Sequence, residues 1–138
     1  MRKEKSCGCI TFNHELKVLL VHMRHGHWSF PKGHVEEGES ELDTAIRETY
    51  EETHVKIDVN TGFREVSTYS PFPGVMKDVV FFIGKALNED IIIQEDELQN
   101  AGFYSVSDAK SMITYDQDLQ IFNHAVAYID VQKEFSNQ

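Results

Sequence analysis

The sequence predicts a single α+β (α/β) domain over residues 1–138, built on a mixed β-sheet that is sandwiched between helices. Two observations predict this class. Short segments rich in β-branched and apolar residues alternate with segments of helical period, which is typical of a sheet covered by helices. The 138 residues, 41% of them hydrophobic, also suffice for one core without disulfide or metal cross-links.

The first two predicted strands cover residues 6–12 and 16–23. The second is too short and too β-branched for a helix, so the two are expected to pair as a hairpin around Asn13-His14. Cys7 and Cys9 lie in the first strand, and we expect them to be buried thiols without chemistry because no further ligands at zinc spacing accompany them.

An ordered loop is predicted next, over residues 28–39, because proline and two glycines interrupt it. A helix should then begin after Ser40, an N-cap residue with Asp43 three positions on, and end near Thr53. One side of this helix is expected to face the core. Its residues are Leu42, Ala45, Ile46, Thr49 and Thr53.

The remaining elements follow from turn residues and periodicity. In chain order they are an extended segment over 55–57, a turn over 60–62, a strand over 63–70, a turn over 71–74, a strand over 79–83 covered on both faces, a strand over 102–106, a short helix opening at Ser107-Asp108 and a longer helix over 118–131.

Charge and hydropathy limit the functional classes. The chain has 13 Lys+Arg against 23 Asp+Glu, a net charge of -10, which disfavours a stable nucleic-acid partner. No segment approaches membrane-spanning length and no targeting signal is recognised, so we expect a cytoplasmic protein without a membrane partner. The charge is uneven, because residues 33–55 hold eight acids and one base while residues 1–32 hold six bases and two acids.

Three glutamates of the predicted helix, Glu48, Glu51 and Glu52, are spaced to share one patch opposite the apolar side. Such an oxygen-rich cluster suits a hard divalent cation such as Mg²⁺. The alternative is an ordinary solvated acidic face. The spacing of these glutamates from Gly33, Glu39 and Arg47 is improbable by chance.

The run Gly33-x5-Glu39-x7-Arg47-Glu48-x2-Glu51-Glu52 resembles the signature box of the Nudix hydrolases, which cleave nucleoside diphosphates linked to another group. Two positions depart from that pattern: Thr49 replaces an aliphatic residue, and His54 replaces a glycine at a helix end that often needs positive φ. Both departures concern local stability, because every charged position is kept.

The resemblance implies the Nudix fold and metal-dependent hydrolysis of a phosphoanhydride with Mg²⁺ or Mn²⁺. It implies metal binding by Glu48, Glu51 and Glu52, with the backbone carbonyl of Lys32 as a further ligand. One of these carboxylates, or Glu97 on a later loop, would accept the proton of the attacking water. Arg47 and Glu39 would form an orienting pair. Glu97 could equally be part of a solvated acidic turn.

The flanking residues resemble one branch of the family, the asymmetrical diadenosine tetraphosphate hydrolases. The similarity includes the run Trp28-x-x-Pro31-Lys32-Gly33-His34-Val35, the strand that follows Lys77, and the acidic loop around Glu97. The residues expected to bind substrate are Lys32, Gly33, His27, His34, Lys77, Tyr69 and Tyr115. The lysines and histidines would contact phosphate and the tyrosines would stack on a base. Solvated lysines and packing tyrosines are the alternatives.

The expected reaction is hydrolysis of a dinucleoside tetraphosphate, for example diadenosine tetraphosphate, to ATP and AMP. Within the enzyme class the rivals are an RNA 5′-pyrophosphohydrolase, in which a glutamine commonly stands at the position of Lys32, and a pyrophosphatase that cleanses the nucleoside triphosphate pool. A Nudix-like module that senses nucleotide without hydrolysing it is the alternative outside that class. The sequence does not indicate an oligomeric state.

Overall fold

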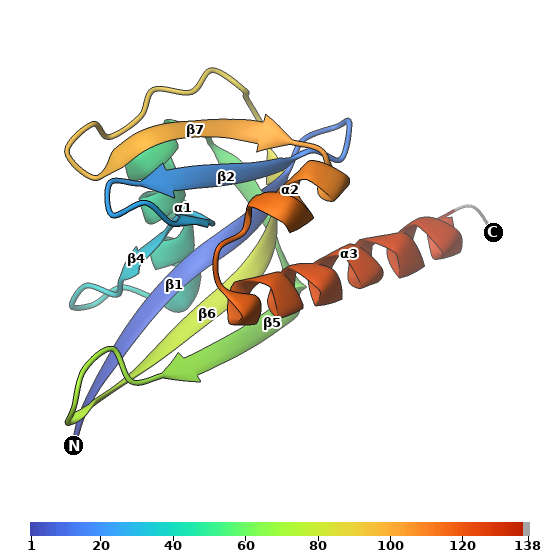
Figure 1. Ribbon diagram of the computed structural model, residues 1–138. Helices are drawn as coiled ribbons and strands as arrows, with labels where there is room; N and C mark the ends of the chain where they lie inside the picture. The colour runs from blue at the N-terminus through green and yellow to red at the C-terminus, as the bar shows by residue number, and fades with distance from the viewer. Residues whose placement is uncertain (137–138) are drawn as a thin grey trace.

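The computed structural model describes residues 1–136 and consists of seven strands and three helices among them (Figure 1). The strands are β1 (Arg2–Phe12), β2 (Val18–Met23), β3 (Trp28–Ser29), β4 (Lys32–His34), β5 (Ile57–Tyr69), β6 (Val75–Ala86) and β7 (Leu98–Tyr104). The helices are α1 (Glu41–Thr53), α2 (Val106–Met112) and α3 (Asp116–Ser136). No helix among residues 1–136 is both long enough and apolar enough to cross a membrane.

The strands form one mixed sheet with the order β3-β2-β1-β6-β5, to which β4 adds at β1 and β7 adds at β2. The long strands β1 and β6 are parallel, from Arg2 opposite Val75 to Phe12 opposite Lys85. The other pairs are antiparallel. Along its other edge β1 pairs with β4 at its middle, over residues 6–8, and meets β2 only at its end, so the sheet divides there.

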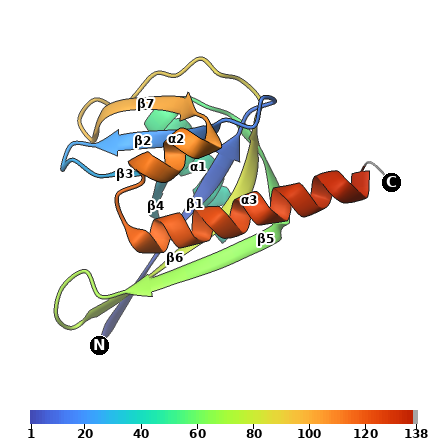
Figure 2. The same ribbon diagram turned by 45° about the vertical axis from the view of Figure 1, so that its right-hand side comes forward.

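Helices cover both faces of the sheet, as predicted. Figure 1 shows α1 behind the sheet and α2 and α3 in front of it, and Figure 2 shows α3 running across β5. The alternating side chains of β6 supply both cores, because Val79 and Phe81 pack on the side of α3 while Val80 and Phe82 pack on the side of α1. Each such buried side chain contributes about 1.5–3 kcal/mol.

Helix α1 begins and ends as predicted. Ser40 Oγ accepts a hydrogen bond from the Asp43 N–H at 3.0 Å, and His54 follows the last turn with φ of 61°, in the left-handed region. The buried side is more polar than the expected stripe, and Ile46 was wrongly assigned to it because its side chain is 38% exposed. Buried Thr49 and Thr53 satisfy their hydroxyls by donating to the carbonyls four residues earlier.

Other predictions need correction. The hairpin of the first two strands is closed only at Phe12 opposite Val18, after which the strands diverge to other partners. The expected loop over 28–39 contains the short strands β3 and β4. The expected turn over 60–62 lies within β5, where the pairing with β6 shifts register. The N-cap of α2 is Ser105, two residues before the predicted start. The turn over 71–74 and the buried thiols of Cys7 and Cys9 are confirmed.

Candidate active site

The three glutamates of α1 differ in depth. Glu51 is exposed, Glu48 is half-buried, and Glu52 is 1% exposed, so the expectation that all three share a patch opposite the core-facing side is wrong for Glu52. A Glu52 carboxylate oxygen accepts a hydrogen bond of 2.9 Å from the Lys32 backbone N–H. Burial, and next the neighbouring Glu48 carboxylate, raise the pKa of Glu52 to about 9.

Glu48 and Glu97 lie close to Glu52. Burial raises the pKa of Glu48 against the opposing effect of Arg47, and the Glu97 charge adds to the increase at both Glu48 and Glu52. Glu97 comes from the segment just before β7, so that segment places a fourth carboxylate beside α1. At Gly33 of β4, a Cβ atom would overlap the Glu48 carboxylate, so a larger residue there would displace that carboxylate.

Arg47 is the centre of an ion-pair network. Its guanidinium donates to both oxygens of Glu39, at 2.6 and 2.9 Å, and to Glu48 at 2.7 Å and Glu51 at 3.1 Å. It also donates to the His34 carbonyl at 3.0 Å. The bonds from Arg47, and next from the Thr44 hydroxyl, lower the pKa of Glu39 to about 2. Arg47 therefore ties the loop before α1, and β4, to the helix that carries the glutamates.

The donors fit a hard divalent cation. Glu48, Glu52 and Glu97 offer only oxygen, the charges of Glu48 and Glu97 raise the pKa of Glu52, and the recorded hydrogen bond of Glu52 comes from a neutral backbone N–H. A cation bound among them would relieve this repulsion. Within residues 1–136, however, no three Asp, Glu, His or Cys side chains are arranged as a closed metal site, and Arg47 instead bonds to Glu48 and Glu51.

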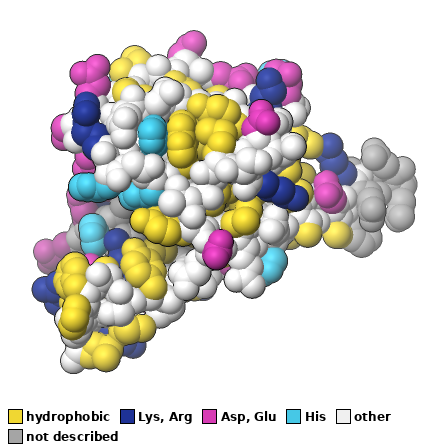
Figure 3. Space-filling model, in the orientation of Figure 1, with side chains coloured by type: hydrophobic (Ala, Val, Ile, Leu, Met, Phe, Trp, Pro, Cys, Tyr) yellow, Lys and Arg dark blue, Asp and Glu magenta, His cyan; other side chains and the backbone are white. Residues whose placement is uncertain are grey.

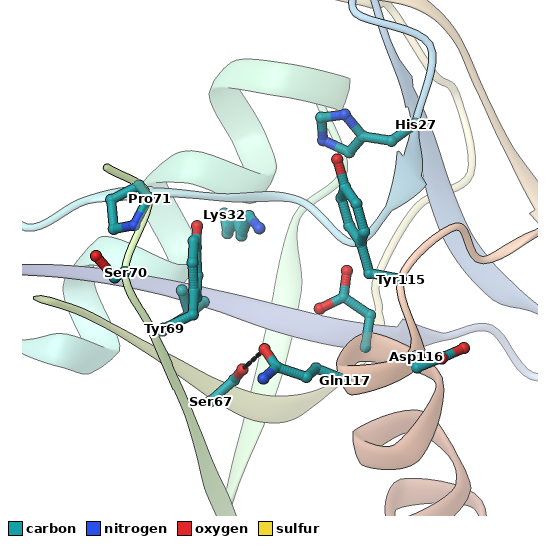
Figure 4. A pocket seen from close by; sticks show the side chains of 11 residues that line it. His27, Lys32, Ser67, Tyr69, Ser70, Pro71, Tyr115, Asp116 and Gln117 are labelled. Atoms are coloured by element: carbon teal, nitrogen blue, oxygen red, sulfur yellow. Dashed lines mark hydrogen bonds between the residues drawn. The ribbon is translucent and has the colours of Figure 1, made fainter. Parts of the chain in front are cut away.

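A cavity of about 510 Å³ lies beside this cluster and brings four of the predicted substrate residues together. They are His27, Lys32, Tyr69 and Tyr115. Figure 4 shows Tyr69 and Tyr115 on opposite sides of the cavity, with Lys32 between and behind them and His27 at the tip of Tyr115. The rings of His27 and Tyr115 are 5.3 Å apart between centroids.

The cavity combines cationic and apolar surface. Burial, and next the charge of Lys32, lower the pKa of His27. Lys77 is paired with Tyr69 across β5 and β6, and burial together with Lys32 lowers its pKa, which places the two lysines near each other. Both lysines can therefore face the same anion.

Three predicted substrate residues do not line the cavity: Lys77, which is paired with Tyr69 of the cavity wall, and two that occupy other positions. His34 is exposed and contributes its carbonyl to Arg47, and Gly33 lies against Glu48. The sequence interpretation missed Gln117 and Asp118, which line the cavity from the first turn of α3. Asp118 is buried, and its charge acts on both Tyr69 and His27. The signal available in the sequence was that Gln117 and Asp118 follow Tyr115 closely.

Comparisons with known proteins identify a family and a set of relatives. The sequence pattern of the NUDIX domain matches residues 2–124. The asymmetrical bis(5'-nucleosyl)-tetraphosphatase of Sus scrofa is 33% identical over 104 residues, which cover 65% of this chain and 70% of the relative. The Rattus norvegicus enzyme of the same name is 34% identical over 104 residues, with the same coverage. A solved structure of a C. elegans Ap4A hydrolase binary complex superposes with a TM-score of 0.82 at 27% identity, covering 92% of this chain and 98% of that one.

Proposed function

The chain belongs to the Nudix hydrolase family, and we propose that its substrate is a dinucleoside tetraphosphate, which it hydrolyses to a nucleoside triphosphate and a nucleoside monophosphate. Diadenosine tetraphosphate would give ATP and AMP. The relatives named bis(5'-nucleosyl)-tetraphosphatase support this substrate, as does the cavity beside the glutamates.

One observation carries the proposal: Lys32 belongs to both parts of the site. Its backbone N–H holds the buried Glu52 carboxylate, and its side chain lines the cavity between the two tyrosines. A nucleoside stacked on Tyr69 or Tyr115 would thus direct its phosphate chain past the Lys32 ammonium toward the carboxylates. Nucleobases stack on aromatic faces with little dependence on sequence, at about 1–3 kcal/mol per base.

The carboxylates supply the chemistry. Glu48, Glu51 and Glu52, with the Lys32 backbone carbonyl and Glu97, are the residues we propose to hold Mg²⁺ or Mn²⁺. Such an ion, when bound, neutralises the phosphate oxygens and lowers the pKa of water. The attacking water loses its proton to a carboxylate, with Glu97 as our candidate, while the new P–O bond forms and the bridging P–O bond breaks.

The cationic residues bind the rest of the phosphate chain. Four phosphates carry more negative charge than the bound metal ions can balance, so Lys32 and Lys77 are proposed to pair with the distal phosphates. His27 can donate a hydrogen bond to a phosphate oxygen. Arg47 is bonded to four groups of the chain and acts as a positioning residue together with Glu39.

A substrate panel tests the proposal. The purified chain is assayed with diadenosine tetraphosphate, 5'-triphosphorylated RNA, ADP-ribose and oxidised dGTP, each with Mg²⁺ and with Mn²⁺. We expect the highest kcat/KM for diadenosine tetraphosphate, with ATP and AMP as products. A higher value for RNA or for oxidised dGTP would replace the proposal with the corresponding rival, and no turnover of any compound would favour a nucleotide-sensing module.

A further inference from the structure

Asp118 is a buried carboxylate in the wall of the nucleotide cavity. Asp118 is 7% exposed, and its Oδ2 accepts a hydrogen bond of 3.0 Å from the hydroxyl of Ser29, which is itself buried. This is the one side-chain hydrogen bond to the carboxylate that the structure records among residues 1–136. A carboxylate can accept several hydrogen bonds, so Oδ1 is the oxygen available to a ligand.

Asp118 and Lys32 give the wall of the cavity two side chains of opposite charge. A buried carboxylate repels phosphate, so the phosphate chain belongs beside Lys32 and the nucleoside beside Asp118. Gln117 stands next to it. Because the Gln117 carboxamide oxygen accepts from Ser67 Oγ at 2.9 Å, its amide nitrogen is the end that can donate. The wall of the cavity therefore offers one acceptor, on Asp118, and one donor, on Gln117.

We propose that Asp118 makes the site specific for a 6-aminopurine, by accepting a hydrogen bond from the exocyclic amino group of adenine. The inference rests on the proposed nucleotide substrate and adds the identity of its base. Adenine presents its amino donor beside a ring-nitrogen acceptor, which matches the pair formed by Asp118 and Gln117. Hypoxanthine has a carbonyl oxygen in place of the amino group, so that oxygen would face the Asp118 carboxylate and be repelled.

A purely structural role for Asp118 predicts a different result. The residue lies in the first turn of α3, where a carboxylate is favoured by the helix dipole, and its bond to Ser29 links α3 to β3. Loss of those contacts would lower stability without changing the preference between adenine and hypoxanthine. The base preference is therefore the readout that separates the two roles.

The experiment compares ATP with ITP in equilibrium binding, and diadenosine with diinosine tetraphosphate in hydrolysis, for the natural chain and for Asp118→Asn. The natural chain should prefer adenine by about 10-fold to 100-fold, as expected for a hydrogen bond to a charged group. In Asp118→Asn the carboxamide oxygen can keep the Ser29 bond and the amide nitrogen can donate to the hypoxanthine carbonyl. The preference should then fall to near unity or reverse.

Two control variants keep the test decisive. Asp116→Asn makes the same charge change in the same helical turn. Asp116 also lines the cavity, but its side chain is directed away from the tyrosines (Figure 4), so this variant should retain the adenine preference. Ser29→Ala removes the bond to Asp118 but leaves the carboxylate, and should also retain it. An equal ratio in the natural chain and in Asp118→Asn would overturn the inference, as would failure of both ATP and ITP to bind. A third outcome is that the chain prefers ATP to ITP in an Asp118-dependent way but does not hydrolyse either tetraphosphate. That outcome would overturn only the proposed substrate.

Discussion

The Glu52 carboxylate is buried, and its contributions to activity and to stability can be measured separately. Glu52→Gln preserves the shape of the side chain and can still accept from the Lys32 N–H. We expect kcat to fall by about 100-fold or more, since a negative charge proposed to hold the metal beside the reacting phosphates is lost, while the far-ultraviolet circular dichroism spectrum stays unchanged. Near-normal kcat would remove Glu52 from the residues proposed to hold the metal.

The pH dependence of stability gives a second measurement on Glu52. Its pKa is raised from an ordinary value of 4.5 to about 9 in the folded chain without metal. Between these values the unfolded carboxyl is ionised and the folded one is protonated, so unfolding releases a proton and stability falls as pH rises. In urea unfolding with chelator, the stability of Glu52→Gln relative to the natural chain should therefore rise with pH over this window and level off outside it. A constant difference would show that Glu52 is ionised in the folded state.

Lys32 can be tested without disturbing Glu52, because the bond to Glu52 comes from the backbone. Lys32→Gln should lower kcat/KM on diadenosine tetraphosphate more than on ADP-ribose, since the longer phosphate chain needs more counter-charge. We expect a difference of about 10-fold between the two substrates. An equal loss on both would argue against contact between Lys32 and the distal phosphates.

Single residues also mark the limit of sequence interpretation. Helical period predicted that Glu48 and Glu52 lie together, but it could not tell what covers them. Glu52 is buried because the segment before β7 closes over the end of α1, with the Gln94 N–H donating to the Glu52 carbonyl at 3.0 Å. Asp118 was missed because its cavity is assembled from segments about 90 residues apart, as its bond to Ser29 shows.

At the scale of elements, the end of α1 offers a direct test of backbone strain. His54 has φ of 61°, a conformation that glycine adopts at less cost, and its ring stacks on Tyr50 at 4.9 Å. Both His54→Gly and His54→Ala lose the ring, and only glycine relieves the backbone. We expect His54→Gly to be more stable than His54→Ala by about 1 kcal/mol, measured by urea unfolding. Equal stability of the two variants would mean that the left-handed conformation costs nothing here.

The prediction of helices and strands succeeded where neighbouring residues determine the element. It failed where pairing with a distant strand determines it. The limits of α1 followed from Ser40 and from periodicity, and the strand over 79–83 followed from an apolar run. The residues Asn60, Thr61 and Gly62 are typical of a turn, yet β5 continues through them because β6 is long enough to pair on both sides of the irregularity. Strand order depends on such distant contacts, so the layers were predictable and the division of β1 between β4 and β2 was not.

At the scale of the whole molecule, the acidic side chains are unevenly distributed. Residues 33–55 carry a net charge of -7, from eight acids and one base. Figure 3 shows further acidic side chains along the upper edge, over the segment that joins β6 to β7. This segment includes Glu97, so two acidic regions distant in sequence meet at the candidate metal site.

Metal binding should therefore stabilise the folded chain. With Mg²⁺ at about 100 times its dissociation constant, the free energy of unfolding should rise by about 2.7 kcal/mol, and Glu52→Gln should lose most of this gain. Calorimetric melting with MgCl₂, and with NaCl at equal ionic strength, measures it. An equal rise with NaCl would reduce the effect to general screening of the acidic surface.

The residues of the two parts of the site are distributed differently along the sequence. Lys32, Glu48 and Glu52 come from one stretch of 21 residues, whereas the cavity walls come from the separate segments around His27, Tyr69 and Tyr115. A change in any one wall segment leaves the hydrolytic stretch untouched. The architecture thus allows a lineage to exchange its substrate by altering loops while the reaction is retained, and it makes Asp118 a position where such an exchange could begin.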